Sequence, residues 1–178
     1  IFWSVVLVGI IGVFVFFWLI SAGKLGFMPT FEELENPNNR FASEVYFADG
    51  PIMNRYFEKE NRKYIEYREI PQSVIDALIA TEDVRFYDHS GVDVRGLFRV
   101  AKGLLTANTS AGGGSTISQQ LAKMLFPRES DLNVFELAIR KFREWVIAVR
   151  LEKSYTKEEI LTMYLNKYDF LNLAVGIS

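Results

Sequence analysis

ATEDVRFYDHSGVD, residues 80–93, places two adjacent acids, an aromatic side chain and the only histidine of the chain in one short stretch. The residues before it repeat apolar side chains at helical spacing, starting after Pro71, a residue that suits the first turn of a helix. Gly91 favours a turn after the acids. The sequence therefore predicts the end of a helix followed by a turn, with Glu82 and Asp83 at the junction.

Glu82 has two interpretations from this stretch alone. It is either an ordinary solvated acid at a helix end, or a carboxyl group partly removed from water by the apolar helix. Loss of water raises the pKa of a glutamate above about 4.3, which suits a general base. Asp83 is its neighbour on a helix, where adjacent side chains point apart. For His89, a structural role in orienting the turn is favoured over a role as acid or base.

The composition of the 178-residue chain limits its function. There is no cysteine, which excludes disulfides, thiolate metal sites and thiol catalysis. A single histidine argues against a histidine-rich zinc site. The net charge of −2 gives no global reason to expect nucleic acid as a partner. Acid–base chemistry must then fall mainly to carboxylates, lysine or tyrosine.

The first twenty residues carry no charge, and about 20 apolar residues are needed for a helix to cross a bilayer core. Trp3 and Trp18 suit the two interfaces. A signal peptide has a shorter apolar core, and a buried soluble helix keeps a polar face. We therefore expect a transmembrane helix at 1–22 and a linker rich in Gly, Pro and Asn at 23–41. The cation-poor flank favours the non-cytoplasmic side for the rest of the chain.

The remaining chain is predicted to be mostly helical. Residues 42–70 alternate apolar and polar side chains around Asp49-Gly50, which predicts a β-hairpin region before a catalytic core at 71–178. Residues 94–107 form a basic amphipathic segment, either a surface helix or a contact with anionic lipid head groups. Further helices are expected at 115–126, 134–153 and 156–165.

Ser154 to Lys157 match S-x-x-K, the acylating motif of penicillin-binding transpeptidases, but the companion motifs S-D-N and K-T-G are absent. The stretch is better interpreted as a helix start, because Thr156 and Glu159 form a capping box.

Cations occur on the next helices. Lys123 lies after side chains that offer neutral hydrogen bonds, and Arg140 and Glu144 are spaced to share a helix face. That pair is either a surface ion pair or, with Lys141, part of a cluster that stabilises an anionic leaving group such as a diphosphate. An acid, hydrogen-bonding side chains and cations beside a membrane together suit transfer from a lipid-linked sugar diphosphate.

Four blocks of the chain resemble, in family order, the peptidoglycan glycosyltransferases of family 51: ATEDVRFYDHSGVD, GGSTISQQLAKMLF, RKFREWVIAVRLEKSYTKEEIL and MYLN, spanning residues 80–166. These enzymes occur in bifunctional class A penicillin-binding proteins, such as the 1A type, and as monofunctional glycosyltransferases. The resemblance implies a mainly α, bilobal, lysozyme-like domain, with its smaller lobe partly embedded in the bilayer and a mobile flap at 94–112. It also implies a single-pass protein of the bacterial inner membrane, with the catalytic domain on the outer, periplasmic side.

The resemblance implies that Glu82 is the base that deprotonates the GlcNAc 4-hydroxyl of lipid II. That oxygen attacks the anomeric carbon of the growing glycan strand and displaces undecaprenyl diphosphate with inversion. Glu144 is implied as the second catalytic carboxylate, which helps the diphosphate or a divalent cation such as Mg²⁺ or Mn²⁺ bound to it. The implied substrate-binding residues are Asp83, Ser115, Thr116, Gln119, Gln120, Lys123, Arg140 and Lys141. Those implied to shape the site are Phe86, His89 and Gly91.

The chain departs from the family pattern in two places. Thr162 stands where the fourth block often carries a glutamate, and the chain ends at AVGIS where the last block would continue, so 71–178 is expected to be an incomplete domain. The YFADG stretch is similar to the segment that precedes this domain in bifunctional members, which favours a bifunctional parent.

Two other functions remain open. A lysozyme-like glycan-cleaving enzyme also uses a glutamate, although it typically needs a second carboxylate flanking the bond and has no need of the cations. A membrane-anchored scaffold would bind lipid II, or cell-wall synthesis and division proteins, without catalysis.

Overall fold

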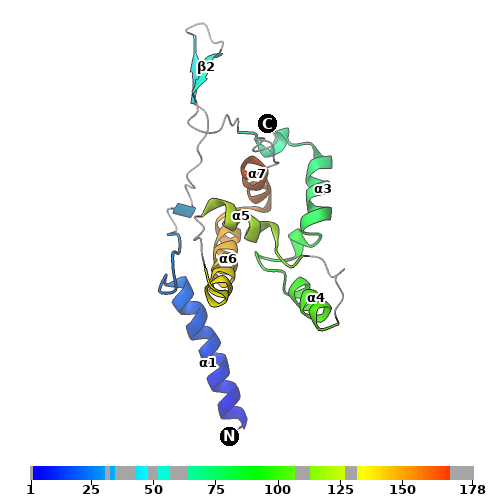
Figure 1. The fold of residues 1–178 in the computed structure, drawn as a ribbon. Helices are drawn as coiled ribbons and strands as arrows, with labels where there is room; N and C mark the ends of the chain where they lie inside the picture. The colour runs from blue at the N-terminus through cyan, green and yellow to red at the C-terminus, as the bar shows by residue number, and fades with distance from the viewer. Residues whose placement is uncertain are drawn as a thin grey trace.

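The computed structural model describes residues 2–30, 33–34, 43–47, 52–56, 64–106, 113–126 and 132–168. Helix α1 runs away from the other helices as one long rod, and the paired strands lie at the opposite end of the molecule (Figure 1). Helices α5, α6 and α7 lie between these ends, with α3 and α4 to one side (Figure 1). The elements are α1 (Phe2–Ser21), β1 (Ser43–Tyr46), β2 (Ile52–Tyr56), η1 (Tyr67–Glu69), α3 (Gln72–Glu82), η2 (Phe86–Asp88), α4 (Val94–Leu105), α5 (Ile117–Leu125), α6 (Val134–Ser154) and α7 (Lys157–Lys167).

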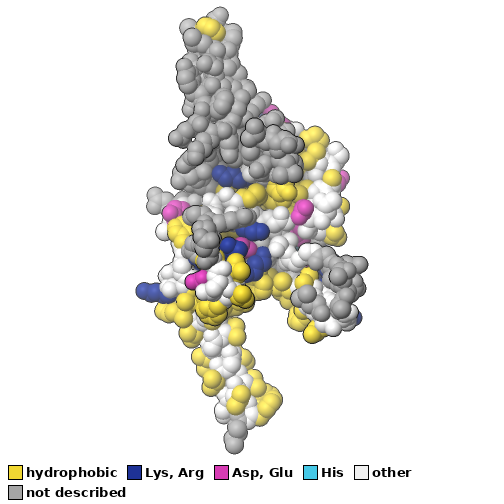
Figure 2. Space-filling view, viewed as in Figure 1, with side chains coloured by type: hydrophobic (Ala, Val, Ile, Leu, Met, Phe, Trp, Pro, Cys, Tyr) yellow, Lys and Arg dark blue, Asp and Glu magenta, His cyan; other side chains and the backbone are white. Residues whose placement is uncertain are grey.

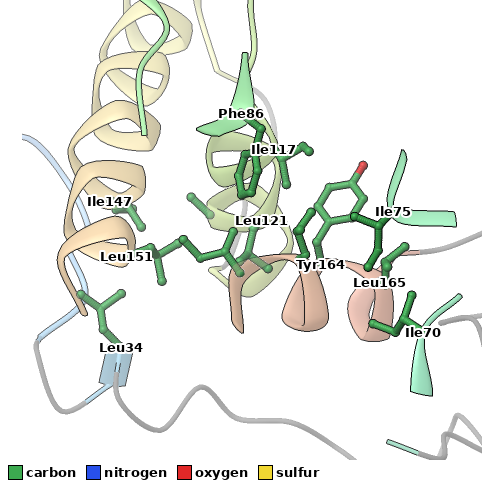
Figure 3. Close-up of a cluster of buried hydrophobic side chains, with 13 residues drawn as sticks. Leu34, Ile70, Ile75, Phe86, Ile117, Leu121, Ile147, Leu151, Tyr164 and Leu165 are labelled. Atoms are coloured by element: carbon green, nitrogen blue, oxygen red, sulfur yellow. The ribbon is translucent and has the colours of Figure 1, made fainter. Parts of the chain in front are cut away.

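The core forms where the short helix α5 packs against both α6 and α7. Ile117 and Leu121 of α5 are fully buried, as are Leu151 of α6 and Leu165 of α7 (Figure 3). Burying a side chain of this size stabilises the fold by about 1.5–3 kcal/mol. Phe86 of the η2 turn joins the same cluster, so the stretch after Glu82 is anchored in the core. The mainly helical fold predicted from the sequence is confirmed.

Side-chain caps define where the central helices begin. Thr116 caps α5 by accepting the N–H of Gln119, and Asn133 forms a capping box at α6. Thr156 and Glu159 form the predicted capping box at α7, which confirms that this stretch is a helix start. Each such cap is worth about 1 kcal/mol and fixes which residues lie at the exposed N–H end of the helix.

Helix α1 is long and apolar enough to cross a membrane, and most of its side chains are exposed. Its last turns pack on α6: the rings of Phe16 and Phe17 meet Phe142 edge-on, with centroids 5.3 and 5.8 Å apart. Arg150 of α6 donates hydrogen bonds to the carbonyl and hydroxyl oxygens of Ser21 at 2.8 and 2.7 Å. The apolar helix and the helical core are therefore one packed unit at this end.

Part of the segment expected to be a linker packs on the core. Arg150 also donates to the carbonyl of Pro29, and the hydroxyl of Tyr155 donates to the carbonyl of Leu34, whose side chain is fully buried. Composition at 23–41 indicated only a connector, because a single buried leucine among polar residues is not distinctive. Residues 35–41 lie outside the described residues.

Strands β1 and β2 pair antiparallel, with Ser43 opposite Tyr56 and a register shift between Val45 and Tyr46. The predicted turn residues, Asp49 and Gly50, lie outside the part of the chain that the structure describes.

Candidate functional site

Glu82 is the last residue of α3, and its side chain is exposed. The desolvation considered for it from the sequence is therefore not found, because the helix ends there and leaves the carboxylate at the surface. One oxygen, Oε2, accepts a hydrogen bond of 2.8 Å from Nε2 of Gln120 on α5. The structure thus brings Glu82 and Gln120 together, although 38 residues separate them.

Asp83 points the other way, into the protein. Its side chain is only 4% exposed and accepts the backbone N–H of Ile117 at 3.1 Å and Nε2 of His89 at 3.0 Å. Ile117 is the first residue of α5, where free N–H groups and the helix dipole favour an anion. Asp83 therefore fixes the turn to the start of α5 and also bonds the His89 ring within the turn.

Gly91 brings the turn onto α6. It has φ +94°, and a Cβ atom there would lie 2.7 Å from the carbonyl carbon of Ala148. Its carbonyl accepts hydrogen bonds from Thr116 Oγ1 at 2.7 Å and Gln119 Nε2 at 3.2 Å. Both of those side chains are buried, so they hold the turn, and Thr116 also lines a polar cavity beside Glu82.

Lys157 supports the turn from α7. Its Nζ donates to the carbonyl of His89 at 2.7 Å, pairs with Glu152 at 2.7 Å and lies 4.2 Å from the centre of the Phe86 ring. The glutamate also accepts from Ser118 of α5. The lysine of the S-x-x-K match is therefore committed to structure, as the absence of its companion motifs indicated.

A polar cavity of about 180 Å³ lies beside Glu82, lined also by Arg85, Arg99 and Ser115. Arg85 pairs with Asp93, which also accepts the N–H of Gly96 at 3.0 Å. Burial opposes ionisation of Asp93, but the guanidinium and the N–H outweigh it and hold the pKa of Asp93 below its ordinary value. The Arg85 charge is thereby compensated, while Arg99 donates only a weak bond to the carbonyl of Gly113 at 3.4 Å.

A second hollow lies on the other side of Glu82, between α3 and α7, with a volume of about 540 Å³. Its walls are mostly apolar and include Val74, Leu78 and Leu165. Glu82 lines both hollows. Its carboxylate is therefore reachable by groups bound on either side.

Ser115 joins the polar cavity to the cations of α6. Nζ of Lys141 donates to Ser115 Oγ and to Oε2 of Glu144, both at 2.9 Å. The side chain of Glu144 is 10% exposed. An ion pair between Arg140 and Glu144 was one of the two interpretations of their spacing. In the structure Lys141 is the partner of Glu144, because a spacing of three residues also brings helical side chains together.

Lys123 and Arg140 are half-buried and form no ion pair or hydrogen bond with any other residue in the described ranges. Figure 2 shows Lys and Arg side chains gathered around an acidic side chain near the middle of the face shown. Because no carboxylate in the described part of the chain neutralises Lys123 or Arg140, both are available to an anionic ligand.

The residues in the described ranges do not offer a set of ligands that would hold a resident metal ion. Among the described residues, no three His, Asp or Glu side chains gather in a metal-binding group. Glu144 lies among the cations of α6, and one of its oxygens is held by Lys141. A single carboxylate paired with an ammonium group is a poor donor set for Mg²⁺, which prefers several oxygen ligands.

Tyr164 of α7 was not singled out from the sequence. Its hydroxyl donates to Oε1 of Gln120 at 3.0 Å, so it is one bond removed from Glu82. It stands inside the MYLN block, but neither its type nor its spacing indicates a partner on another helix.

Known proteins match this chain over most of its length. A family model described as Transglycosylase matches residues 49–178. The chain is 39% identical to penicillin-binding protein 1A of Escherichia coli over 150 residues, which cover 84% of the chain and 17% of that protein. It is 42% identical to penicillin-binding protein 1F of Bacillus subtilis over 118 residues, 66% of the chain and 16% of that protein. The chain spans about a sixth of the length of these relatives.

Proposed function

The chain belongs to the transglycosylase family, the peptidoglycan glycosyltransferases of family 51, and from this premise we propose that its parent protein polymerises lipid II into glycan strands. The observation that carries the proposal is the position of Glu82. It is an exposed carboxylate between two hollows, one of which leads through Ser115 to cations. A transferase must hold two sugars with a base between them, and this arrangement supports that requirement.

In the proposed reaction, Glu82 accepts the proton of the GlcNAc 4-hydroxyl of the acceptor. The oxygen then forms a bond to the anomeric carbon of the growing strand, with inversion, and the bond from that carbon to undecaprenyl diphosphate breaks. The diphosphate leaves with the electron pair. Gln120 holds one oxygen of Glu82, which leaves the other free for the hydroxyl.

The leaving diphosphate needs charge stabilisation more than a proton. Lys141, Lys123 and Arg140 are the cations that would supply it, with Glu144 setting the position of the Lys141 ammonium through a 2.9 Å bond. Glu144 is thereby a support for the cations and not a second base. A Mg²⁺ or Mn²⁺ ion, if used, would take most of its oxygen ligands from the diphosphate, since one carboxylate is offered here.

The membrane arrangement is also a proposal. Helix α1 would cross the inner membrane, with the catalytic domain on the outer side. Three exposed apolar residues of α4, Val94, Phe98 and Leu105, share one face by their spacing, and Val134 and Phe135 are exposed at the start of α6. These patches would insert into the surface of the bilayer and would belong to the smaller lobe of a bilobal domain.

A glycan-cleaving enzyme is the second candidate. Glycan hydrolases typically flank the bond with a second carboxylate. Glu144 is paired with Lys141, and Asp83 is turned into the core, so neither is offered as that group. A non-catalytic scaffold would not require Glu82 at all.

The test is lipid II polymerisation by the full-length parent in liposomes, comparing Glu82→Gln with Asp76→Asn as the control. Asp76 is an exposed carboxylate on the same helix, away from both hollows. We expect long glycan strands from the parent and the control, and none from Glu82→Gln with unchanged folding. Fragments released from pre-formed glycan would instead support cleavage, and equal polymerisation by Glu82→Gln would remove Glu82 as the base.

A further inference from the structure

Three side chains from three helices form one hydrogen-bonded chain that ends at Glu82. The hydroxyl of Tyr164 on α7 donates to Oε1 of Gln120 on α5 at 3.0 Å, and Nε2 of the same amide donates to Oε2 of Glu82 at 2.8 Å. The three residues are far apart in the sequence, so the tertiary fold alone brings them together. Only Glu82 is exposed, and Tyr164 lies in the core.

Tyr164 is always a hydrogen-bond donor in this series of three side chains. It is 1% exposed, and Figure 3 shows its ring in the buried cluster with the hydroxyl directed away from α7. Burial, followed by the negative charge of Glu82, raises the pKa of Tyr164 well above its ordinary value of 10. The phenol therefore keeps its proton throughout the pH range in which an enzyme of this kind works.

The tyrosine determines which end of the Gln120 amide faces the base. A phenol that donates to the amide carbonyl turns the amide nitrogen toward Glu82. In the opposite orientation, the carbonyl oxygen would face an ionised carboxylate, which has no proton to share. That orientation would place two acceptors against each other and is disfavoured.

We propose that Tyr164 is a positioning residue for glycosyl transfer and acts through Gln120. By fixing the amide, it keeps Oε2 of Glu82 occupied and leaves Oε1 as the oxygen that receives the proton of the acceptor hydroxyl. This inference rests on the proposed function, since it concerns the base of that reaction. It also gives Gln120 a different role from substrate binding: the amide holds the base.

The proposal predicts a specific kinetic effect of Tyr164→Phe, which removes the hydroxyl and keeps the ring. The amide becomes free to turn, so a hydrogen bond that favours the ionised base is weakened. We expect the turnover number to fall about tenfold, with the KM for lipid II changed by less than about twofold. The acid limb of the pH–activity profile should move to higher pH, because the base then needs a lower proton concentration to remain ionised.

Tyr87→Phe is the matched control, since it removes the same hydroxyl from an exposed tyrosine of the η2 turn that lines neither hollow beside Glu82. The Tyr87→Phe variant should leave the pH profile unchanged. A purely structural role for Tyr164 would lower the unfolding temperature and the amount of active enzyme without moving the acid limb.

A double-mutant cycle tests whether Tyr164 acts through the amide. In the Gln120→Ala background, Tyr164→Phe should have no further effect on turnover or on the acid limb. Additive effects, or an unchanged acid limb in Tyr164→Phe, would overturn the proposal. Glu82→Gln distinguishes failure of this inference from failure of the proposed function. If Glu82→Gln is inactive while Tyr164→Phe behaves as the parent, only the role of Tyr164 is wrong. If Glu82→Gln polymerises lipid II normally, the proposed function itself is wrong.

Discussion

The carboxylate of Asp83 accepts the backbone N–H of Ile117 at 3.1 Å, which joins the end of α3 to the first residue of α5 across 34 positions of sequence. Because Glu82 precedes Asp83 and Gln120 comes three residues after Ile117, this bond helps to bring Glu82 within hydrogen-bonding distance of Gln120. Of the two adjacent acids, the buried one, Asp83, therefore holds the exposed one, Glu82, in place.

Asp83→Ala is expected to destabilise the fold by about 2–4 kcal/mol, since it leaves a buried N–H and the His89 ring without their partner. Thermal unfolding of the parent in detergent, followed by circular dichroism, measures the change. Asp76→Ala, an exposed position on α3, should change the stability by less than about 0.5 kcal/mol. Equal stability of the two variants would contradict the role of Asp83.

Gly91→Ala is expected to be among the most damaging single-methyl substitutions in the chain. The residue has φ +94°, and the added Cβ would lie within 2.8 Å of backbone atoms of α6, which cannot move aside. Strain and overpacking together should cost about 2–4 kcal/mol of stability. Gly113→Ala is the control, because a Cβ there meets no atom within 4 Å. The same unfolding measurement applies, and tolerance of Gly91→Ala would show that the turn can leave α6.

Lys141→Met is expected to weaken binding of the diphosphate leaving group by about tenfold or more, because a charge-assisted contact is lost. It should also cost stability, since Glu144 is left largely buried without its ammonium partner. Inhibition of polymerisation by undecaprenyl diphosphate measures the first effect. Lys153→Met, an exposed position on the same helix, should leave that inhibition unchanged. Unaltered inhibition in Lys141→Met would exclude the lysine from the diphosphate site.

The raised pKa of Tyr164 leads to a prediction for alkaline solution. Below pH 10 the phenol is protonated in both the folded and unfolded chain, so it adds no pH dependence. Above pH 10 the unfolded chain releases the proton while the folded chain retains it, and stability falls as the pH rises. Tyr164→Phe should therefore lose less stability than the parent between pH 10 and pH 11 in a urea titration. Parallel losses in both proteins would indicate that the phenol ionises freely in the fold.

The helices were predictable because their signals are local. The spacing of apolar residues and the Thr156 capping box are each recognisable within one or two helical turns, and α1 is an unbroken run of mostly apolar residues. The block at 80–93 could be singled out as a candidate site for the same reason, because its acids, aromatic side chain and histidine lie within one short stretch. The contacts that complete the site are not local: Gln120 with Tyr164, Lys141 with Ser115, and Arg150 with Ser21 each join different elements.

Side-chain exposure is the property of the site that local sequence predicts least well. Thr116 and Gln119 have the polar side chains of ligand-binding residues, yet both are buried against the Gly91 carbonyl. Glu82 ends an apolar helix, yet it is exposed. Which face of a short helix meets the core depends on where its neighbours lie, and spacing within the segment does not contain that information.

The packing of α1 on α6 has a consequence for how substrate is found. Phe142 contacts two aromatic rings of α1, and Arg150 holds the end of the same helix. With α1 in the bilayer, this joint would hold Glu82 at a constant height above the lipid surface. A sugar carried on a membrane-embedded tail would then reach Glu82 by lateral diffusion in the membrane alone. Its encounter with Glu82 would be a two-dimensional search, because the height of both groups above the bilayer is already fixed.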